Sequence, residues 1–221
     1  MGKPVRKRLP AKEAARALEI FERLAAFMPE PKTELAFYSP FTLLVAVVLS
    51  AQATDKSVNK ATEKLYARAD TPEKMAALGA EGITPFIQSI GLYRNKAKNV
   101  AALSRILLEQ YGGQVPLERA ALQALPGVGR KTASVVLNEL DIEPAIAVDT
   151  HVFRVAHRLK LSSGRVPDAV EAELMAVVPP AFLAKAHHWL ILHGRYTCLA
   201  RRPKCEVCPI ADLCPSRDLF V

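Results

Sequence analysis

The sequence predicts an all-α fold of about ten short helices. Apolar side chains recur every three to four residues along most of the chain, which is the spacing of one helix face. No segment shows the alternation of apolar and polar residues that is typical of a strand. The chain has 221 residues, 50% of them hydrophobic and 24% charged, so it can bury a core in one or two domains.

The helices of the N-terminal half are indicated by periodicity and by capping residues. An amphipathic helix is predicted over Ala11–Phe27, with Leu18, Phe21, Leu24 and Phe27 as its apolar stripe. Phe41–Ala51 is apolar on all sides and predicts a buried central helix. The other boundary signals are Thr54 as a cap, Thr71-Pro72 and Thr84-Pro85 as helix starts, and Gly112-Gly113 closing a helix over Asn95–Tyr111.

The C-terminal half continues the helical pattern and then changes character. Helical runs are predicted at Leu117–Leu125, Lys131–Leu140, Val152–Leu161, Pro167–Val178 and Pro180–Gly194. From Cys198 onward, cysteines, prolines and charges replace the periodicity, as expected of a short loop-rich module around a metal.

Composition and charge exclude several classes of protein. A disordered chain would hold fewer apolar residues, and a disulfide-rich mini-protein would hold far more than 4 cysteines. Phe41–Leu49, the longest apolar stretch, is too short to span a membrane, so we expect a cytoplasmic protein with no membrane partner. The 30 Lys and Arg against 22 Asp and Glu favour a polyanionic partner, most simply nucleic acid. We expect the basic arm 3–8 to be a disordered tail.

The segment Leu125–Ala133 predicts a phosphate-binding hairpin between two helices. Gly127 and Gly129 allow positive φ and a close approach of the backbone to a ligand. The loop opens directly into a helix, whose first amides lack partners and whose dipole favours an anion. Arg130 adds positive charge. A plain corner between helices would require only one glycine, so the phosphate site is the favoured interpretation.

Lys131, with Asp149 eighteen positions later, forms the candidate catalytic pair. A lysine at a helix N-terminus beside Arg130 lies in a positive field that favours its neutral, nucleophilic amine, which can form a Schiff base. The alternative for Lys131 is a phosphate contact. Asp149 precedes a helical run, so the alternative for its carboxylate is the common role of an N-cap.

The four cysteines follow the pattern C-x6-C-x2-C-x5-C and all fall within 17 residues. Structural disulfides are disfavoured in an intracellular chain, so four clustered thiolates indicate a metal, either zinc or an iron–sulfur cluster. Paired zinc sites usually show two short spacings, and the longer outer gaps here favour a single cluster. The set is Cys198, Cys205, Cys208 and Cys214.

Taken together and in this order, these features closely resemble the endonuclease III family of helix–hairpin–helix DNA glycosylases. The resemblance covers about residues 15 to 216. The matching segments are Leu49–Asp55, Ser89–Tyr93, Leu125–Thr132, Ala147–His151, His187–Cys198 and the cysteine tail.

The resemblance implies two helical domains that flank a DNA-binding cleft. Residues 33–143 would form a six-helix barrel with the helix–hairpin–helix, and 1–32 with 144–221 a discontinuous domain with a [4Fe-4S] cluster loop at 198–214. The partner would be duplex DNA with damaged pyrimidines or abasic sites, bound by a monomer at the nucleoid.

The resemblance also implies a role for each site residue. Lys131 would attack C1′ of the damaged nucleotide with help from Asp149, and β-elimination from the Schiff base would nick the strand 3′ to the lesion. Gln52, Ile90 and Leu92 would fill the gap left by the extruded base, and Asp55 and His151 would line its pocket. Further DNA contacts are implied for Leu125, Gly127, Gly129, Arg130, Thr132, Arg201, Arg202 and Lys204, and cluster ligation for the four cysteines.

Some of these residues have purely structural alternatives, and other functions compete with the glycosylase interpretation. Gln52 could be a polar helix end and Leu92 a core residue, while His187 and His188 are interpreted as structural. The rival within the superfamily is the adenine-mismatch glycosylase, which lacks the catalytic lysine and usually carries a further C-terminal domain. A passive DNA-binding hairpin module and a cluster-based redox protein are the rivals from other classes.

Overall fold

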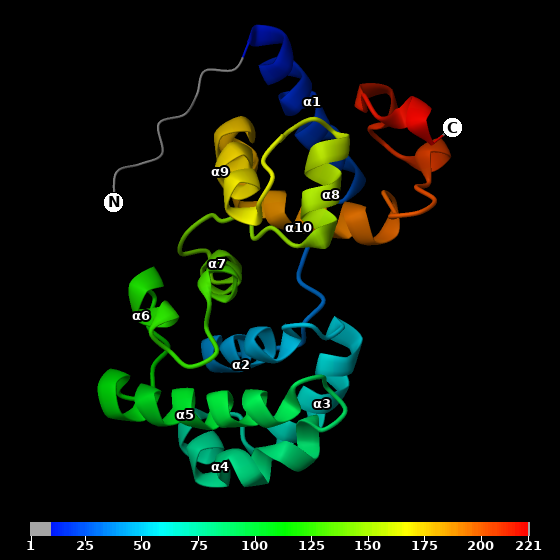
Figure 1. Cartoon of the computed structure of the whole chain (residues 1–221). Helices are drawn as coiled ribbons and strands as arrows, with labels where there is room; N and C mark the ends of the chain where they lie inside the picture. Colours follow the sequence, from blue (N-terminus) through cyan, green and yellow to red (C-terminus); the bar gives the residue numbers. More distant parts are fainter. Residues whose placement is uncertain (1–9, 221) are drawn as a thin grey trace. The chain divides into compact units, whose positions relative to one another are not determined.

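The computed structural model describes residues 10–220 and divides the chain into two compact units. Unit 1 combines Met1–Lys32 with Glu143–Val221, and unit 2 is Thr33–Ile142 (Figure 1). The sequence-based boundary at 143 differs by one residue, since Glu143 groups with unit 1. Within residues 10–220 every regular element is a helix and no strand is present, which confirms the all-α prediction. The basic arm 3–8 lies outside the described residues.

Unit 2 consists of six helices, one of which is buried over residues 41–49. They are α2 (Pro40–Ser50), α3 (Asp55–Arg68), α4 (Pro72–Ile87), α5 (Tyr93–Tyr111), α6 (Arg119–Gln123) and α7 (Arg130–Glu139). Every residue of Phe41–Leu49 in α2 is buried, as its continuous apolar sequence predicts. Ser39 and Thr42 form a reciprocal capping box at its start. In Figure 1, α5 lies between α2 and α4 and contacts both.

The predicted helix start at Thr84-Pro85 is wrong. The interruption of α4 lies at Gly79, whose φ of 62° and ψ of 178° break the helical path. Glycine adopts this conformation without a Cβ clash, whereas Pro85 is accommodated inside the second part of α4. The Thr84 hydroxyl does not cap a new helix but donates to the Ala80 carbonyl one turn back, at 2.8 Å.

Unit 1 packs its helices around an aromatic core. Its elements are α1 (Ala11–Phe27), α8 (Thr150–Arg158), α9 (Pro167–Val177), α10 (Leu183–Tyr196) and four single-turn 3₁₀ helices, η1 (Pro180–Phe182), η2 (Cys205–Val207), η3 (Ala211–Leu213) and η4 (Arg217–Leu219). Phe21 of α1 stacks on Phe182, with ring centroids 6.2 Å apart, and also contacts Trp189. The indole N–H of Trp189 donates to the Met28 carbonyl at 2.8 Å, which ties α10 to the end of α1.

The apolar stripe of α1 is displaced from its predicted position. Leu18 and Phe27 are 41% and 57% exposed, whereas Ile20, with Phe21 and Leu24, is buried. Periodicity alone shows that the helix has an apolar side, but the neighbouring helices decide where that side is centred.

Among the described residues, no single helix is long and apolar enough to cross a membrane. The segments Pro167–Val177 and Pro180–Tyr196 meet that criterion only as a pair, which is bent by 119°.

Because Phe41–Leu49 of α2 are all buried, shortening one of these side chains should destabilise the protein strongly. Leu44 is 0% exposed, so Leu44→Ala is expected to lower the free energy of unfolding by about 2–5 kcal/mol. The matched control is Leu117→Ala, also in unit 2, where the leucine is 48% exposed and the expected change is within about 0.5 kcal/mol. Chemical denaturation measures both; equal losses for the two variants would contradict a core centred on α2.

Candidate functional site

Two buried side chains attach the hairpin between α6 and α7 to the core of unit 2. Leu125 and Val128 are 3% and 5% exposed, and the Val128 amide donates to the Leu125 carbonyl at 3.1 Å. Gly127 has a φ of 79°, and a Cβ added there would lie 2.8 Å from Nδ2 of Asn99. Gly127 is therefore required both by the backbone conformation and by the close approach of α5. Since the Leu125 side chain is in the core, only its main chain is available to a ligand.

Gly129 differs from the sequence-based expectation of positive φ. Its φ is −84° and ψ 178°, and it is the N-cap of α7 without any capping side chain. A Cβ at this position would meet nothing within 4 Å. Open space thus lies over the first amides of α7, whose N–H groups have no acceptor earlier in the helix. This is the geometry in which a helix N-terminus accepts a phosphate.

The side chains around this helix start are cationic and accessible. Arg130 and Lys131 are exposed in the first turn of α7, and Thr132 is half-buried beside them. Arg119 of α6 donates to the Ser134 hydroxyl at 2.8 Å and braces the two helices of the hairpin. Lys131 is therefore an exposed amine in the first turn of a helix that begins without a side-chain cap.

Two further loops of unit 2 hold non-glycine residues in the left-handed conformation. Gln52, after α2, has a φ of 54°, and Leu92, the N-cap of α5, has a φ of 60°. Such a conformation costs about 1–3 kcal/mol for a side chain with a Cβ and persists where the surroundings enforce it. Both side chains are exposed, Leu92 by 56%. Leu92 is thus an exposed loop residue, which excludes the alternative that it belongs to the core.

Ile90 requires a correction. Its side chain is 2% exposed and belongs to the hydrophobic core of unit 2. The residue therefore supports the loop that carries Leu92 rather than reaching into a duplex. Asp55, by contrast, lies half-buried in the first turn of α3, behind the Thr54 cap.

Asp149 serves as the N-cap of α8 in unit 1. Its Oδ1 accepts hydrogen bonds from the amides of His151 at 2.9 Å and Val152 at 2.8 Å. The capping alternative is therefore correct for Oδ1, and the capping bonds leave Oδ2 unused. Two amide bonds fix the direction of the carboxylate, which is what a catalytic carboxylate also needs. Lys131 belongs to unit 2 and Asp149 to unit 1.

His151 lies in the first turn of α8, next to that carboxylate. Its Nδ1 is 3.3 Å from Nη2 of Arg154, which also donates to the Gly194 carbonyl at 2.8 Å. A Cβ on Gly194 would lie 2.9 Å from Cβ of His151, so α8 and α10 meet at a contact that only glycine allows. His187 and His188, also on α10, are buried within unit 1.

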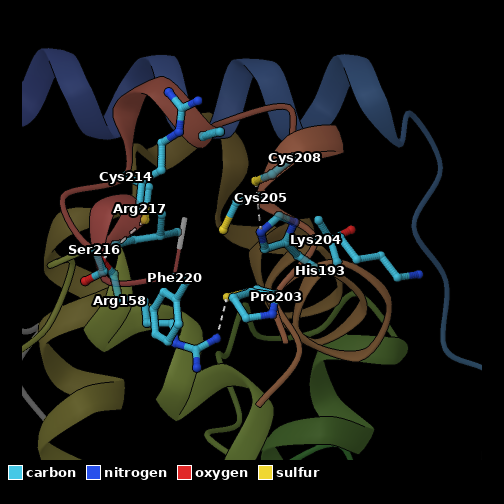
Figure 2. Close-up of a pocket in the computed structure, with 14 residues that line it drawn as sticks. Arg158, His193, Pro203, Lys204, Cys205, Cys208, Cys214, Ser216, Arg217 and Phe220 are labelled. Carbon is cyan, nitrogen blue, oxygen red and sulfur yellow. Dashed lines mark hydrogen bonds between the residues drawn. The ribbon is translucent and has the colours of Figure 1, made fainter. Parts of the chain in front are cut away.

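All four cysteines line one cavity in unit 1, as Figure 2 shows for Cys205, Cys208 and Cys214. None forms a disulfide. Among the described residues, no three His, Cys, Asp or Glu side chains are grouped tightly enough to hold a metal ion. Four free thiols that line one cavity are a suitable ligand set for a metal centre.

The chemistry around these thiols also suits a cationic cluster. Burial raises the pKa of the Cys208 thiol to about 11, so its thiolate form requires a compensating positive charge. Arg158 donates to Sγ of Cys198 at 3.3 Å, and Nε2 of His193 lies 3.8 Å from Sγ of Cys208. Burial lowers the pKa of His193 to about 4, so this imidazole is neutral at pH 7.

Sequence reasoning did not identify Arg158 and His193 as part of this cavity. Arg158 precedes Cys198 by 40 positions, so no local spacing connects the two. The predicted DNA-contacting residues of the cluster loop, Arg201, Arg202 and Lys204, are all exposed.

Comparison with known proteins identifies both parts of the chain. Residues 45–180 match the HhH-GPD superfamily of base excision DNA repair proteins, and residues 198–214 match the iron–sulfur binding domain of endonuclease III. The cofactor is a [4Fe-4S] cluster.

Whole-chain comparisons agree with these matches. The chain is 58% identical to endonuclease III of Escherichia coli K12, over 92% of this chain and 97% of that protein. It is 57% identical to endonuclease III of Rickettsia conorii, over 89% and 93%. A solved structure of a trapped endonuclease III–DNA covalent intermediate superimposes with a TM-score of 0.87 at 42% identity, covering 96% of this chain and 99% of that one. The chain therefore belongs to the endonuclease III family of the HhH-GPD superfamily.

Proposed function

We propose that Lys131 is the nucleophile of a DNA glycosylase and abasic-site lyase that acts on damaged pyrimidines in duplex DNA. The enzyme class itself follows from the family to which the chain belongs. The observation that carries the assignment of Lys131 is its exposed position in the first turn of α7, directly after an uncapped, glycine-built anion site. A phosphate of the DNA backbone at that site would place a nucleotide next to the amine.

The proposed reaction has two stages, excision of the base and cleavage of the strand. The neutral amine of Lys131 forms a bond to C1′ while the bond between C1′ and the damaged base breaks, and the base leaves with a proton. Opening of the sugar gives a Schiff base, which makes a C2′ hydrogen acidic. Loss of that proton and departure of the 3′-phosphate break the strand 3′ to the lesion.

Asp149 is proposed to assist at the same nucleotide. Its capping bonds occupy Oδ1, so Oδ2 can accept the proton of the lysine amine or stabilise the positive charge that develops on the sugar. The carboxylate thus combines two roles, since the bonds that begin α8 also fix the direction of the catalytic oxygen.

Binding of the lesion requires that the damaged base leave the helical stack, which costs a few kcal/mol and is easiest for damaged pairs. We propose that Gln52 and Leu92, both exposed and left-handed, fill the space left behind. Asp55 and His151 are proposed to contact the extruded base. The enzyme is proposed to act as a monomer in the cytoplasm, at the nucleoid, where this substrate is found.

The four cysteines are proposed as ligands of the [4Fe-4S] cluster. When bound, the cluster supplies the positive charge that four partly buried thiolates require and cross-links η2, η3 and the loop that follows α10. The loop between Cys198 and Cys205 then presents its exposed Arg201, Arg202 and Lys204 to the DNA backbone.

Borohydride trapping tests the nucleophile. With a duplex that contains one abasic site, the wild type should give a covalent protein–DNA band on reduction, and Lys131→Ala should give none because the substitution removes the amine proposed to form the Schiff base. Lys60→Ala, which removes an exposed lysine of α3, is the matched control and should trap like the wild type. A band of full strength from Lys131→Ala would overturn the assignment. Absence of a band from the wild type would favour the adenine-mismatch class or a passive binding module.

Asp149→Asn should separate capping from catalysis. Asparagine caps helices about as well as aspartate, so thermal stability is expected to stay close to that of the wild type. Base excision should fall by about 10²–10⁴-fold, because an amide cannot accept the proton or balance the sugar charge. Single-turnover excision and thermal denaturation measure the two effects. If excision were unchanged while Asp149→Ala merely lost stability, Asp149 would be only a cap.

The two glycines of the hairpin should respond differently to substitution. Gly127→Ala is expected to destabilise the protein by about 1 kcal/mol or more, because φ is positive there and Asn99 leaves no room. Gly129→Ser should keep or slightly raise stability, since serine is a good N-cap, yet its hydroxyl would occupy the amides offered to phosphate. DNA affinity should therefore drop for Gly129→Ser in a fluorescence anisotropy titration. Unchanged affinity would show that α7 does not bind a phosphate.

A further inference from the structure

Lys96 is a buried lysine for which the proposed reaction has no use. It lies in the first turns of α5 and is only 4% exposed. Among the ion pairs of residues 10–220, none involves Lys96. Burial lowers the pKa of its amine, because no opposite charge offsets the loss of water. An apolar side chain of similar length would fill this place at less cost, so the amine calls for a specific explanation.

Within residues 10–220, the amine of Lys96 has one hydrogen-bond partner, which belongs to another helix. Nζ of Lys96 donates to the carbonyl of Leu49 at 2.9 Å, next to the last residue of α2. Carbonyls in the last turn of a helix accept no hydrogen bond from within that helix. A cation placed there also interacts favourably with the negative end of the helix dipole. α2 has no basic residue in its own last turn. Lys96 therefore supplies from α5 the positive charge that α2 lacks.

This bond joins the end of α2 to the start of α5, the two helix ends that flank the loops of Gln52 and Leu92. Gln52 follows Leu49 by three positions, and Leu92 precedes Lys96 by four, with the Lys96 amide donating to the Leu92 carbonyl at 3.1 Å. A Cβ on Gly91 would lie 3.8 Å from the Gln52 carbonyl, so the loops themselves are adjacent. The side chain of Lys96 thus bonds to the helix end that leads into the Gln52 loop, and its main chain bonds to Leu92.

We propose that Lys96 is a positioning residue that holds Gln52 and Leu92 in register, so that both side chains enter the duplex together when a base is extruded. The inference rests on the gap-filling role proposed above for these two residues. Without the amine, the end of α2 and the start of α5 can shift apart, and each left-handed residue can relax toward an unstrained conformation. Opening of the duplex would then be impaired, while the chemistry at Lys131 would not.

The test compares one damaged base in two settings. A ring-saturated thymine is placed opposite adenine in a duplex, and the same base is placed in an unpaired bulge, where less unstacking is needed. Lys96→Met should lower single-turnover excision about tenfold on the paired duplex and by less than about twofold on the bulge. Lys98→Met, which removes an exposed lysine of the same helix, is the matched control and should act like the wild type on both.

A double-mutant cycle adds a readout that a merely structural role would not move. If Lys96 acts through Leu92, adding Lys96→Met to Leu92→Ala should reduce excision from the paired duplex little further. Equal losses on both substrates, or effects of the two substitutions that multiply, would overturn the inference. If Lys96→Met fails to fold, Lys96→Gln, which keeps a shorter donor, replaces it. Its excision is compared on the paired duplex and on the bulge in the same way. Failure of the proposed function is distinguishable, because the wild type itself would then excise from neither substrate.

Discussion

The burial of α2 is the constraint on which the functional half of unit 2 depends. Nine consecutive side chains, Phe41–Leu49, are withdrawn from water on all sides of one helix, so the neighbouring helices must surround it. α7, which carries Lys131, packs directly against α2, and α5 reaches its end through Lys96. The hairpin and the two strained loops are therefore attached to one rigid element, as precise chemistry on a flexible nucleic acid requires.

Three helix termini carry groups used in the proposals above. α7 begins without a capping side chain, so its amides and dipole remain for a phosphate. α8 begins with Asp149, whose capping bonds aim the carboxylate. α2 ends at a carbonyl that receives a buried ammonium group. The start of α7 is left without a cap and the end of α2 is completed by a buried amine, neither of which helix stability alone would select, whereas Asp149 is a favourable N-cap of α8.

In unit 1, α8 links the Asp149 carboxylate to the cysteine-bearing loop. Asp149 and His151 lie at its start, Arg154 contacts His151 and donates to the Cys198 carbonyl at 3.0 Å, and Arg158 near its end donates to the Cys198 thiol. One short helix thereby connects the residue proposed for catalysis with the metal ligands. These arginine contacts hold the loop against the helix that Asp149 begins.

The sequence by itself determined those features that depend on local chemistry. Helix periodicity, the starts at Thr54 and Thr71-Pro72, the hairpin glycines and the cysteine spacing all act within a few residues, so the all-α fold and the motifs could be predicted. Long-range packing decided the rest. It buried Ile90, exposed Leu18, and brought Arg158 to Cys198 and Lys96 to Leu49. Those contacts join residues tens of positions apart, and burial depends on which neighbours arrive, which no local pattern encodes.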